Sequence, residues 1–523
     1  MRTERLPILA ALCLSLGTGP ALMAQSGALD PTFNSTGYVV QPVNGHDGVQ
    51  KILLQDDGKI LSLGMSWDDT YTARAYVFRY MPDGTLDTDF ATDGMYMHEL
   101  DNEALLYSAV ITATGKILLV GSTTDYQTYR MMLIQLNADG TPDASFGTDG
   151  IVLQSVSAVV ANAEDMLYDV KLDGDGNILA CGSSYDENYV RRPVVVRFTP
   201  SGVLDTTFGV NGLATIPVNA VGSSSFQGIA VQPDGKIVAT GYFGETEWWY
   251  TLLLVRFNAG GTLDDSFSVD GIVKYNYGNV DDQGQDLELT DDGSILVAGR
   301  TVTVTYNYST LLMKFTPDGE VDASFGTAGA VEEDLDDFDY GWEMALQADG
   351  KIIMAGTSGD GPPNGFDLAV WKYQADGTPD MTFGDNGLAM HVIPDYYTMI
   401  YGLDVQADGK ILIGGQARTT NNENYFFTAR LENDIASGIG ASAENSDALV
   451  VWPNPFNDQV TVRIDARTGS VRVELFNAAG QRVLDETRNN MDLVTVRTTH
   501  LPAGSYMLRL TTDKTSITST LVK

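Results

Sequence analysis

The sequence has little cysteine and little histidine, and both shortages narrow what the protein can be. Its 523 residues contain two cysteines and four histidines. Cys13 lies in an N-terminal apolar segment, so a chain without this segment keeps one thiol, Cys181, and no internal disulfide. The histidines, which show no metal-ligand spacing, are His46, His98, His391 and His500. Stability must therefore come from the burial of apolar surface.

Basic residues are also scarce. Lys and Arg number 31 against 69 Asp and Glu, which gives a formal net charge of −38. A surface this acidic repels phosphate backbones and anionic lipids, so nucleic acid is not an expected partner. Residues 449–523 hold seven acidic and nine basic residues, so the negative charge belongs to residues 1–448. The charge predicts an acidic, solvated exterior, with cation binding as the alternative.

Long apolar runs and helical periodicity are missing as well. No stretch after residue 24 is apolar enough to cross a membrane, and no window keeps the 3.6-residue period of a helix. Residues 1–24 look like a secretory signal peptide, with Arg2 and Arg5 before a short apolar core and a small-residue exit. We therefore expect export, cleavage after Ala24 and a mature chain without a membrane span.

A turn rich in Asp and Gly recurs through the chain. Its first copy, residues 55–61, lies between two apolar runs and predicts a β-hairpin, because glycine accepts the positive φ that the turn needs. The same glycine returns every 57 to 61 residues: Gly58, Gly115, Gly176, Gly235, Gly293, Gly350 and Gly409. A second glycine follows six residues later: Gly64, Gly121, Gly182, Gly241, Gly299, Gly356 and Gly415. Such a fixed period indicates a repeat architecture.

A second repeated element is Leu/Pro/Val-Asp-x-x-Phe-x-x-x-Gly. It occurs at residues 29–37, 86–94, 142–150, 204–212, 263–271, 321–329 and 379–387. Each repeat predicts four short antiparallel strands, and such sheets around a ring make a β-propeller, with a solenoid as the alternative. The first copy precedes the first hairpin, and no copy follows the last hairpin set, residues 401–431. We therefore predict an all-β, seven-bladed propeller of 28 strands over residues 29–433, whose N-terminal strand closes the last blade.

These elements resemble a known module. Gln-x-Asp-Gly-Lys-Ile-Leu-x-x-Gly and Leu-Asp-x-x-Phe-Gly-x-x-Gly look like the bacterial delta-60 repeat, a propeller module related in pattern to NHL blades. The resemblance covers residues 29–433, and the third repeat departs from it with Asn177 in place of Lys. It implies a propeller in a secreted or surface protein and no defined reaction.

The end of the chain differs in character. Residues 434–448 are small and polar and predict a flexible linker, whereas residues 449–523 alternate like a small Ig-like β-sandwich. This segment resembles the C-terminal sorting domain of the type IX secretion system. The residues that carry the resemblance are Pro453, Asn454, Pro455, Gly480, Leu501, Gly504 and Tyr506. It implies a Bacteroidota-like bacterium, passage through an outer-membrane translocon and contact with its surface peptidase; a carbohydrate-binding or adhesive sandwich is the alternative.

Aromatic residues gather in the longer connections that we expect on one face of the propeller, which we call the loop side. A rigid scaffold with variable loops on one face commonly displays a binding site. Aromatic rings beside carboxylates suit sugar rings or cationic ligands. The candidate ligand-binding residues are Trp67, Tyr71, Trp248, Trp249, Trp342, Tyr396 and Tyr397. The alternative is that these rings pack between neighbouring blades.

Four aspartates occupy one repeated position, eleven residues before the hairpin glycine: Asp47, Asp165, Asp282 and Asp339. A partial carboxylate ring at the channel mouth would suit Ca²⁺, which favours several oxygen ligands. The alternative is that each aspartate accepts hydrogen bonds from nearby backbone N–H groups. No other cofactor is expected.

The leading hypothesis is a secreted or cell-surface propeller that binds or adheres to a glycan or a protein through the loop side. The sequence contains no Gly-x-Ser-x-Gly elbow and no phosphate-binding glycine loop, so a non-enzymatic role is favoured. One alternative is a polysaccharide-acting hydrolase or lyase that uses carboxylates at the channel mouth. A second alternative is a structural component of a surface layer.

Overall fold

The computed structural model describes residues 26–68, 70, 72–98, 103–125, 127–158, 164–218, 222–246, 249–278, 280–361 and 365–433 in the first part of the chain. In the last part it describes residues 450–452, 459–463, 470–477, 482–489, 493–498, 505–512 and 516–522. The chain divides into two compact units, Met1–Ile435 and Ala436–Lys523. The predicted signal peptide and linker lie outside the described residues. No helix among the described residues is long and apolar enough to cross a membrane.

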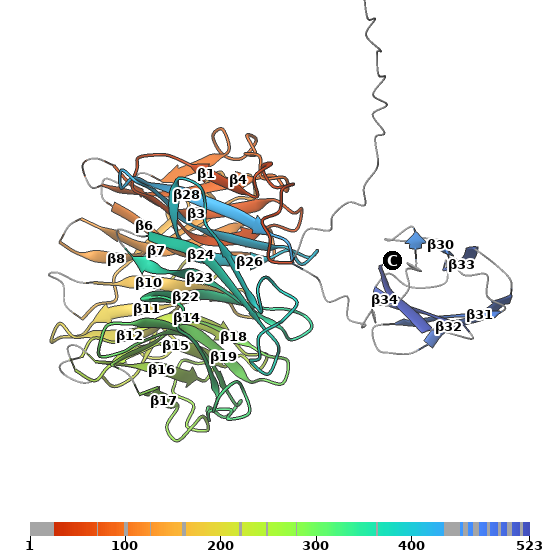
Figure 1. Cartoon of the computed structure of the whole chain (residues 1–523). Helices are drawn as coiled ribbons and strands as arrows, with labels where there is room; N and C mark the ends of the chain where they lie inside the picture. The colour runs from red at the N-terminus through yellow and green to blue at the C-terminus, as the bar shows by residue number, and fades with distance from the viewer. Residues whose placement is uncertain are drawn as a thin grey trace, which may run out of the picture. The chain divides into compact units, whose positions relative to one another are not determined.

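The first unit is built from four-stranded antiparallel sheets, which we call blades 1 to 7 (Figure 1). Blade 1 contains β2 (Asp47–Leu54), β3 (Ile60–Trp67), β4 (Ala73–Tyr80) and β5 (Met95–His98). Blade 2 contains β6 (Glu103–Ile111), β7 (Ile117–Thr124), β8 (Tyr129–Leu136) and β9 (Ile151–Gln154). Blade 3 contains β10 (Met166–Leu172), β11 (Ile178–Tyr185), β12 (Arg191–Phe198) and β13 (Leu213–Thr215). Blade 4 contains β14 (Ser225–Val231), β15 (Ile237–Gly244), β16 (Tyr250–Phe257) and β17 (Ile272–Tyr275).

The remaining blades follow the same order. Blade 5 contains β18 (Asp281–Leu289), β19 (Ile295–Val302), β20 (Tyr308–Phe315) and β21 (Ala330–Glu333). Blade 6 contains β22 (Phe338–Leu346), β23 (Ile352–Gly361), β24 (Gly365–Tyr373) and β25 (Leu388–His391). Blade 7 contains β26 (Tyr396–Val405), β27 (Ile411–Thr419), β28 (Asn424–Leu431) and the N-terminal β1 (Tyr38–Gln41). Strands β1 to β28 thus form the predicted all-β, seven-bladed propeller, and single parallel bridges also link blades 4, 5 and 6.

The two ends of the propeller meet in blade 7. Strand β1 pairs antiparallel with β28, with Tyr38 opposite Ala429 and Gln41 opposite Phe426. Before β1, the N–H of Gly27 donates to the carbonyl of Glu432 at 2.7 Å, and the N–H of Glu432 donates to the carbonyl of Ala28 at 2.8 Å. The predicted closure of the ring is therefore confirmed, and it removes two exposed sheet edges.

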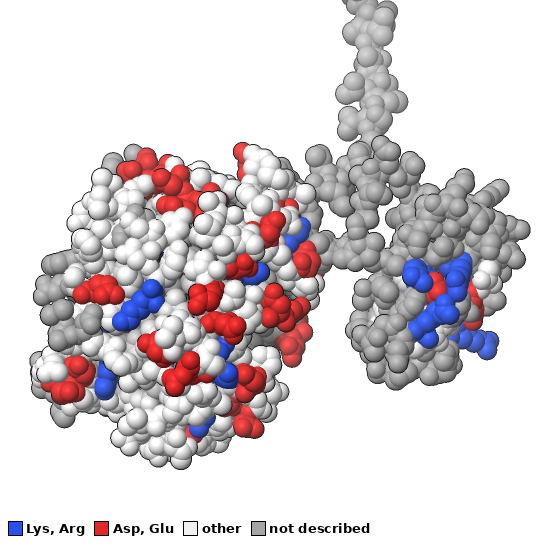
Figure 2. Space-filling model, turned by 90° about the horizontal axis from the view of Figure 1, so that it is seen from below, with Lys and Arg blue, Asp and Glu red and all other residues white. Residues whose placement is uncertain are grey.

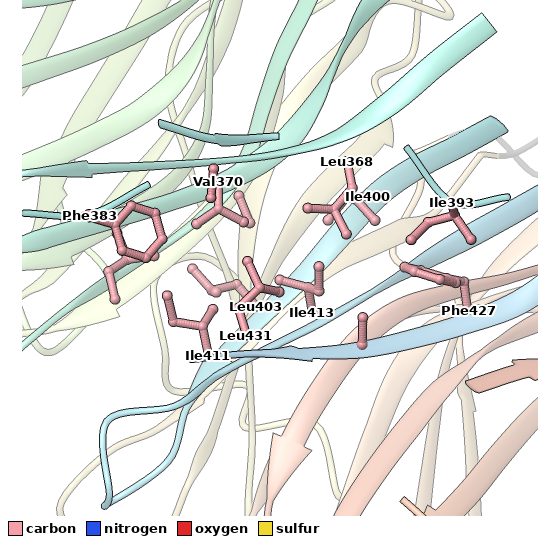
Figure 3. Packing of buried hydrophobic residues seen from close by; sticks show 14 of the residues in the cluster. Leu368, Val370, Phe383, Ile393, Ile400, Leu403, Ile411, Ile413, Phe427 and Leu431 are labelled. Atoms are coloured by element: carbon pink, nitrogen blue, oxygen red, sulfur yellow. The ribbon is translucent and has the colours of Figure 1, made fainter. Parts of the chain in front are cut away.

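Apolar side chains fill the spaces between blades. Figure 3 shows one such layer, in which Leu368, Val370 and Phe383 of blade 6 face Ile400, Leu403 and Ile413 of blade 7. All six side chains are buried. Complete burial of one such side chain is worth about 1.5–3 kcal/mol. The same kind of layer recurs between other blades and supplies the stability expected of a chain without disulfides.

The aspartate of the second repeated element anchors an ion-pair group, which we call the rim triad. In blade 4, Asp264 accepts hydrogen bonds from Lys236 of the hairpin turn at 3.0 Å and from Arg256 of β16 at 2.6 Å. The guanidinium of Arg256 also donates to the carbonyl of Pro317 in blade 5 at 2.6 Å. The triad therefore explains why Lys, Asp and a basic residue recur at this spacing. At the seam, Asp30 makes the same contacts with Lys410 and Arg430.

The second unit is described by itself. It contains a sheet of β29 (Val450–Trp452), β30 (Gln459–Arg463) and β33 (Leu493–Arg497), and a sheet of β31 (Ser470–Asn477), β32 (Arg482–Asn489), β34 (Ser505–Thr512) and β35 (Ser516–Val522). The buried Glu474 accepts hydrogen bonds from Arg482 and Arg509 at 2.9 Å each. Of the predicted sorting residues, Tyr506 is buried in β34. Pro453, Asn454, Pro455, Gly480, Leu501 and Gly504 lie outside the described residues.

Candidate functional site in the central channel

The first strand of every blade lines the central channel, and each of these seven strands contains a β-bulge. The pairing register with the second strand shifts by one residue at the same point in every blade. A bulge leaves one residue unpaired and redirects its side chain. The bulged residues, which we call the channel ring, are Gln50, Tyr107, Tyr168, Gln227, Gln285, Trp342 and Tyr401.

The second repeated glycine stands opposite this bulge. A Cβ atom at any of these seven positions would lie 1.7–2.0 Å from a backbone oxygen of the first strand, far inside contact distance. In blade 2, for example, a Cβ on Gly121 would meet the carbonyl oxygen of Leu105 at 1.9 Å. The glycine is thus required by the close approach of backbone that the bulge creates.

The channel ring borders a cavity of about 260 Å³. Residues from the first strands of all seven blades line it. Besides the channel ring, the lining consists of Lys51, Ser108, Asp169, Asp286 and Glu343, each of which directly follows a bulged residue. The cavity therefore has one layer of aromatic and amide side chains and one layer that is mostly charged.

One wall of the channel is aromatic. Trp342 contacts Tyr401 of blade 7, with ring centroids 5.6 Å apart. It stacks on Tyr340 at 5.7 Å and 19°, and Tyr340 stacks on Phe338 at 6.4 Å and 19°. Tyr308 of blade 5 contacts both Phe338 and Tyr340. These contacts form a continuous run of rings from the loop end of β22 to the cavity.

The opposite wall combines tyrosines with a paired arginine. Tyr107 and Tyr168 meet edge to face, with centroids 5.2 Å apart. Arg191 pairs with Glu164 and lies over the ring of Tyr185. Burial raises the pKa of Tyr168 to about 12 and, on the aromatic wall, that of Tyr401 to about 12. These phenols are therefore neutral hydrogen-bonding groups at physiological pH.

The carboxylates below the channel ring bind the neighbouring blade. Asp169 accepts a hydrogen bond from the backbone N–H of Ile229 at 3.2 Å, and Asp286 accepts one from Met344 at 2.9 Å. Glu343 likewise accepts the N–H of Leu403 at 3.1 Å. Each bond satisfies a buried donor on the inner edge of the next blade, where no further strand can pair. These carboxylates therefore hold the ring of blades together.

One lysine cross-links this layer between blades, and a second pairs within its own strand. Lys51 of blade 1 pairs with Glu343 of blade 6 and passes blade 7 at Gly402, which has no side chain. A Cβ on Gly402 would lie 3.1 Å from the backbone nitrogen of Ile52 in blade 1. Lys171 pairs with Asp169 at 3.2 Å. Blades 7 and 1 can approach each other closely here because this position is a glycine.

Other carboxyl groups here are held nearer to their neutral form. Burial raises the pKa of Asp286 despite the nearby lysines Lys51 and Lys171. Burial, reinforced by the charge of Asp286, raises the pKa of Glu288 to about 7. The channel is consequently an acidic, poorly solvated environment.

Polar groups of the channel ring have few protein partners. The Nε1–H of Trp342 is buried and finds no acceptor among the described residues. The hydroxyl of Tyr168 donates to the sulfur of Met166 at 3.3 Å, and that of Tyr401 faces the sulfur of Met399 at 3.8 Å. Thioether sulfur is a weak acceptor. The channel ring thus retains hydrogen-bonding capacity for a ligand.

The predicted aromatic residues fall in different places. Trp342 lies in strand β22, not in a loop as expected, because the loop before this strand is shorter than the sequence suggested. Tyr396 and Tyr397 begin β26, with Tyr396 against Tyr425 at 6.4 Å. Trp67 ends β3 and packs beside Met65 and Leu105 between blades 1 and 2. Trp249 is 57% exposed. Tyr71 and Trp248 lie outside the described residues.

The four predicted aspartates each hold the loop that leads from the preceding blade into their own. Asp47 accepts a backbone N–H from Val43 at 2.7 Å and the hydroxyl of Ser66 at 2.5 Å. Asp282 accepts the N–H of Tyr277 and the hydroxyl of Thr301. Asp165 and Asp339 likewise accept nearby N–H groups. Among the described residues, no group of three or more His, Cys, Asp or Glu is placed to hold a metal ion.

Each of the two units matches a model of a known protein family. A model described as "Domain of unknown function (DUF5122) beta-propeller" matches residues 55–90, 112–146, 174–208, 232–267, 290–325, 347–383 and 406–434. A model described as "Secretion system C-terminal sorting domain" matches residues 450–523. The chain combines seven DUF5122 propeller repeats with a type IX sorting domain. The sorting domain indicates export to the cell surface or secretion and interaction with the type IX secretion machinery.

Several solved structures are similar to this DUF5122 propeller at low sequence identity. A protein of unknown function from Dyadobacter fermentans is 11% identical, with 76% of this chain and 98% of that chain covered and a TM-score of 0.41. An ulvan lyase of polysaccharide lyase family 25 is 9% identical, with 76% and 96% covered and a TM-score of 0.43. The propeller domain of the trilobed protease from Pyrococcus furiosus is 12% identical, with 76% and 99% covered and a TM-score of 0.36. Among curated proteins, no relative matches the chain.

The channel ring is not apparent from the sequence pattern alone. Its residues stand eight positions before each hairpin glycine, so the repeat alignment already contained them. The repeat pattern does not reveal the bulge. In a regular strand these side chains would lie on a face of the sheet, whereas the bulge turns them toward the channel. The second glycine of each repeat was the available signal, because it marks the residue that the bulge crowds.

Proposed function

We propose that this exported propeller binds a glycan in its central channel, at the channel ring. The observation that carries the proposal is the composition of the ring: four aromatic residues and three glutamines at seven structurally equivalent positions. Aromatic faces pack on the C–H faces of sugars, and amide groups both donate to and accept from hydroxyls. This combination of apolar surface with a few oriented polar groups is typical of small-molecule sites.

Size and unmet hydrogen bonding support a small polar ligand. Ligand pockets commonly measure about 300–1,000 Å³, and the cavity of about 260 Å³ is close to the lower end of that range. A stable protein interface buries about 1,200 Å² or more, which a cavity of this size does not offer. The hydroxyl of Tyr401 faces the weakly accepting sulfur of Met399 at 3.8 Å and would gain a better acceptor from a sugar hydroxyl. A glycan is therefore favoured over a protein partner.

The surface charge is compatible with this proposal. Figure 2 shows Asp and Glu spread over one face of the propeller with fewer Lys and Arg. Such a surface keeps the propeller soluble and disfavours non-specific association with anionic polymers. Export delivers the protein to where extracellular glycans occur.

The test is a glycan-array screen of the full chain, followed by titration of the positive glycans against Trp342→Ala. We expect binding by the unmodified protein and a loss of about 30-fold or more for the variant, as for a central aromatic contact. Trp249→Ala, which removes an exposed tryptophan outside the cavity, is the matched control and should bind normally. A folded protein that binds no glycan, or a Trp342→Ala variant that binds unchanged, would contradict the proposal.

The same samples examine the enzymatic alternative. Chain products of the bound glycan are separated by chromatography after long incubation with the protein. New reducing ends or unsaturated products that vanish in Trp342→Ala would make the propeller a hydrolase or lyase that uses the same site. An unchanged glycan would leave binding as the function.

A further inference from the structure

We propose that the channel ring takes the terminal unit of a neutral oligosaccharide, whose preceding units lie along the aromatic residues of β22. This inference rests on the proposed function and specifies its ligand by length, direction and charge. Its three supports are the order of the rings along β22, the ion-paired layer below the channel ring and the pairing of every nearby cation.

The rings of β22 follow one another at alternate positions of the strand. Trp342, Tyr340 and Phe338 stack in sequence, with interplanar angles of 19° at both steps. Trp342 borders the cavity, whereas Phe338 is the first residue of β22 and lies at its loop end. These half-buried rings form a continuous apolar strip along one direction, which suits successive sugar units of one chain. The chain would therefore enter from the loop side.

The layer on the other side of the channel ring stops the chain. Lys51 reaches across to Glu343, and Asp169 is held by Lys171 and by the hydroxyl of Ser108 at 2.8 Å. Displacing such buried, mutually hydrogen-bonded charges would leave uncompensated ions in a poorly solvated environment. A glycan that reaches the channel ring must end there. The site therefore binds the terminal unit of a glycan rather than units in the middle of a polymer.

The charges near the channel favour a neutral ligand. Each cation at the cavity or on its two walls has a carboxylate partner: Lys51 with Glu343, Lys171 with Asp169, Arg191 with Glu164, and Arg300 with Asp281. Among the described residues, no basic group lies within ion-pair distance of Asp286, Glu288 or Asp404. An anionic sugar would meet net negative charge and no available cation.

Arg300 offers a way to reverse this selectivity. Its guanidinium lies over the rings of Tyr308 and Tyr340, with 5.8 and 5.9 Å to the centroids, and pairs with Asp281 at 3.6 Å. Asp281→Asn would remove the partner and leave a cation beside the aromatic wall. The variant should therefore gain affinity for acidic oligosaccharides.

The experiment titrates the full chain with oligosaccharide ladders of one to six units. The neutral ladders are gluco-, manno-, xylo- and galacto-oligosaccharides, and the acidic ladder is oligogalacturonate. For the neutral series that binds, we expect affinity to rise roughly two- to ten-fold per unit for the first three or four units and then level off, because each ring contact contributes a modest amount. Tyr340→Ala should weaken the tetramer by about five-fold and leave the monomer unchanged, while Tyr189→Ala, an exposed loop tyrosine, should change neither.

The possible outcomes separate the proposed function from the further inference. If no oligosaccharide of any ladder and no glycan of the array binds, the proposed function itself is contradicted. Binding that is independent of length, or binding of polymers with blocked ends as tight as that of free ends, overturns the terminal-unit inference but not the proposed function. Oligogalacturonate binding tighter than every neutral ladder overturns the charge inference. Tight oligogalacturonate binding that appears only in the Asp281→Asn variant supports the charge inference.

Discussion

Carboxylates occupy two regions of the propeller and behave differently in them. At the rim, the aspartates of the second repeated element all have a lowered pKa, whether their triad is complete or lacks one basic member: Asp30, Asp87, Asp143, Asp205, Asp264, Asp322 and Asp380. Burial opposes the ionisation of Asp380, for instance, but the hydrogen bonds from Lys351 and Thr382 and the charge of Lys372 together outweigh it and lower the pKa to about 2. In the channel, burial instead raises the pKa of Asp286, Glu288 and Asp404, whereas the charges of Lys171 and Lys51 overcome burial and lower the pKa of Asp169.

The difference separates scaffold from site. The rim repeats because every blade interface needs the same satisfied hydrogen bonds, so its residues recur in the sequence. Each blade contributes one residue to the channel ring, and these residues need only fit the space and the ligand. Repetition therefore marks the structural role, and departure from repetition marks the candidate functional role.

The largest expected effect concerns the second repeated glycine, which stands opposite the bulge in the channel-lining strand of each blade. Gly121→Ala should lower the free energy of unfolding by about 5 kcal/mol or prevent folding, because the added Cβ would meet the oxygen of Leu105 at 1.9 Å. Gly115→Ala in the same blade is the control. Its φ of +75° costs about 1 kcal/mol, and no atom lies within 4 Å of the added Cβ. Chemical denaturation compares the two, and equal losses would refute the bulge as the reason for the second glycine.

The next effect concerns the outer rim at the seam. Asp30→Ala should cost about 3–5 kcal/mol, since it leaves Lys410 and Arg430 without their shared buried carboxylate. Asp205→Ala in blade 3 should cost less, because Asp205 is more exposed and Asn177 replaces the hairpin lysine. Both values come from urea unfolding. A smaller loss at Asp30 than at Asp205 would mean that closure does not depend on this triad.

The sequence predicted the scaffold better than the site for a physical reason. Blade number, the seam and the export domain follow from turn chemistry and repeated elements, which local residues determine. The channel ring depends on a bulge, which reverses the alternation that a strand pattern assumes. Trp342 was accordingly assigned to a loop although it lies inside β22. The glycines that mark the bulge were visible, but their close contact exists only in the folded blade.

The pH dependence separates the two sets of carboxyl groups. The pKa of Glu288 is raised to about 7, above its unfolded value, so its stabilising protonated state is lost as pH rises through 7. The rim aspartates have lowered pKa values, so their contribution is present above about pH 4 and is lost as pH falls. We expect greatest stability near pH 5 and a loss of roughly 1–3 kcal/mol between pH 5 and 8 that Glu288→Gln abolishes. Thermal unfolding at a series of pH values measures this loss of stability. If stability falls with pH equally steeply in the Glu288→Gln variant, Glu288 is not its cause.

The smallest expected effect is a gain at the rim. Blade 2 has Gln135 where blades 1, 3, 4 and 7 have an arginine that donates to the next blade, as Arg79 does to the carbonyl of Ala138 at 2.6 Å. A pocket lined by Gln135 and Pro200 lies at this interface. Gln135→Arg should fill it and stabilise the protein by about 0.5–1 kcal/mol through one added hydrogen bond. Thermal unfolding should show a small upward shift, and a decrease would mean that the interface cannot accept the guanidinium.

The most direct test of the proposed glycan site is a crystal structure of the full chain with a neutral tetrasaccharide selected from the binding ladders. We expect sugar density in the cavity, with the terminal unit against Trp342 and Tyr401 and the next units over Tyr340 and Phe338. Density confined to the outer loops, or an empty cavity at saturating ligand, would contradict it.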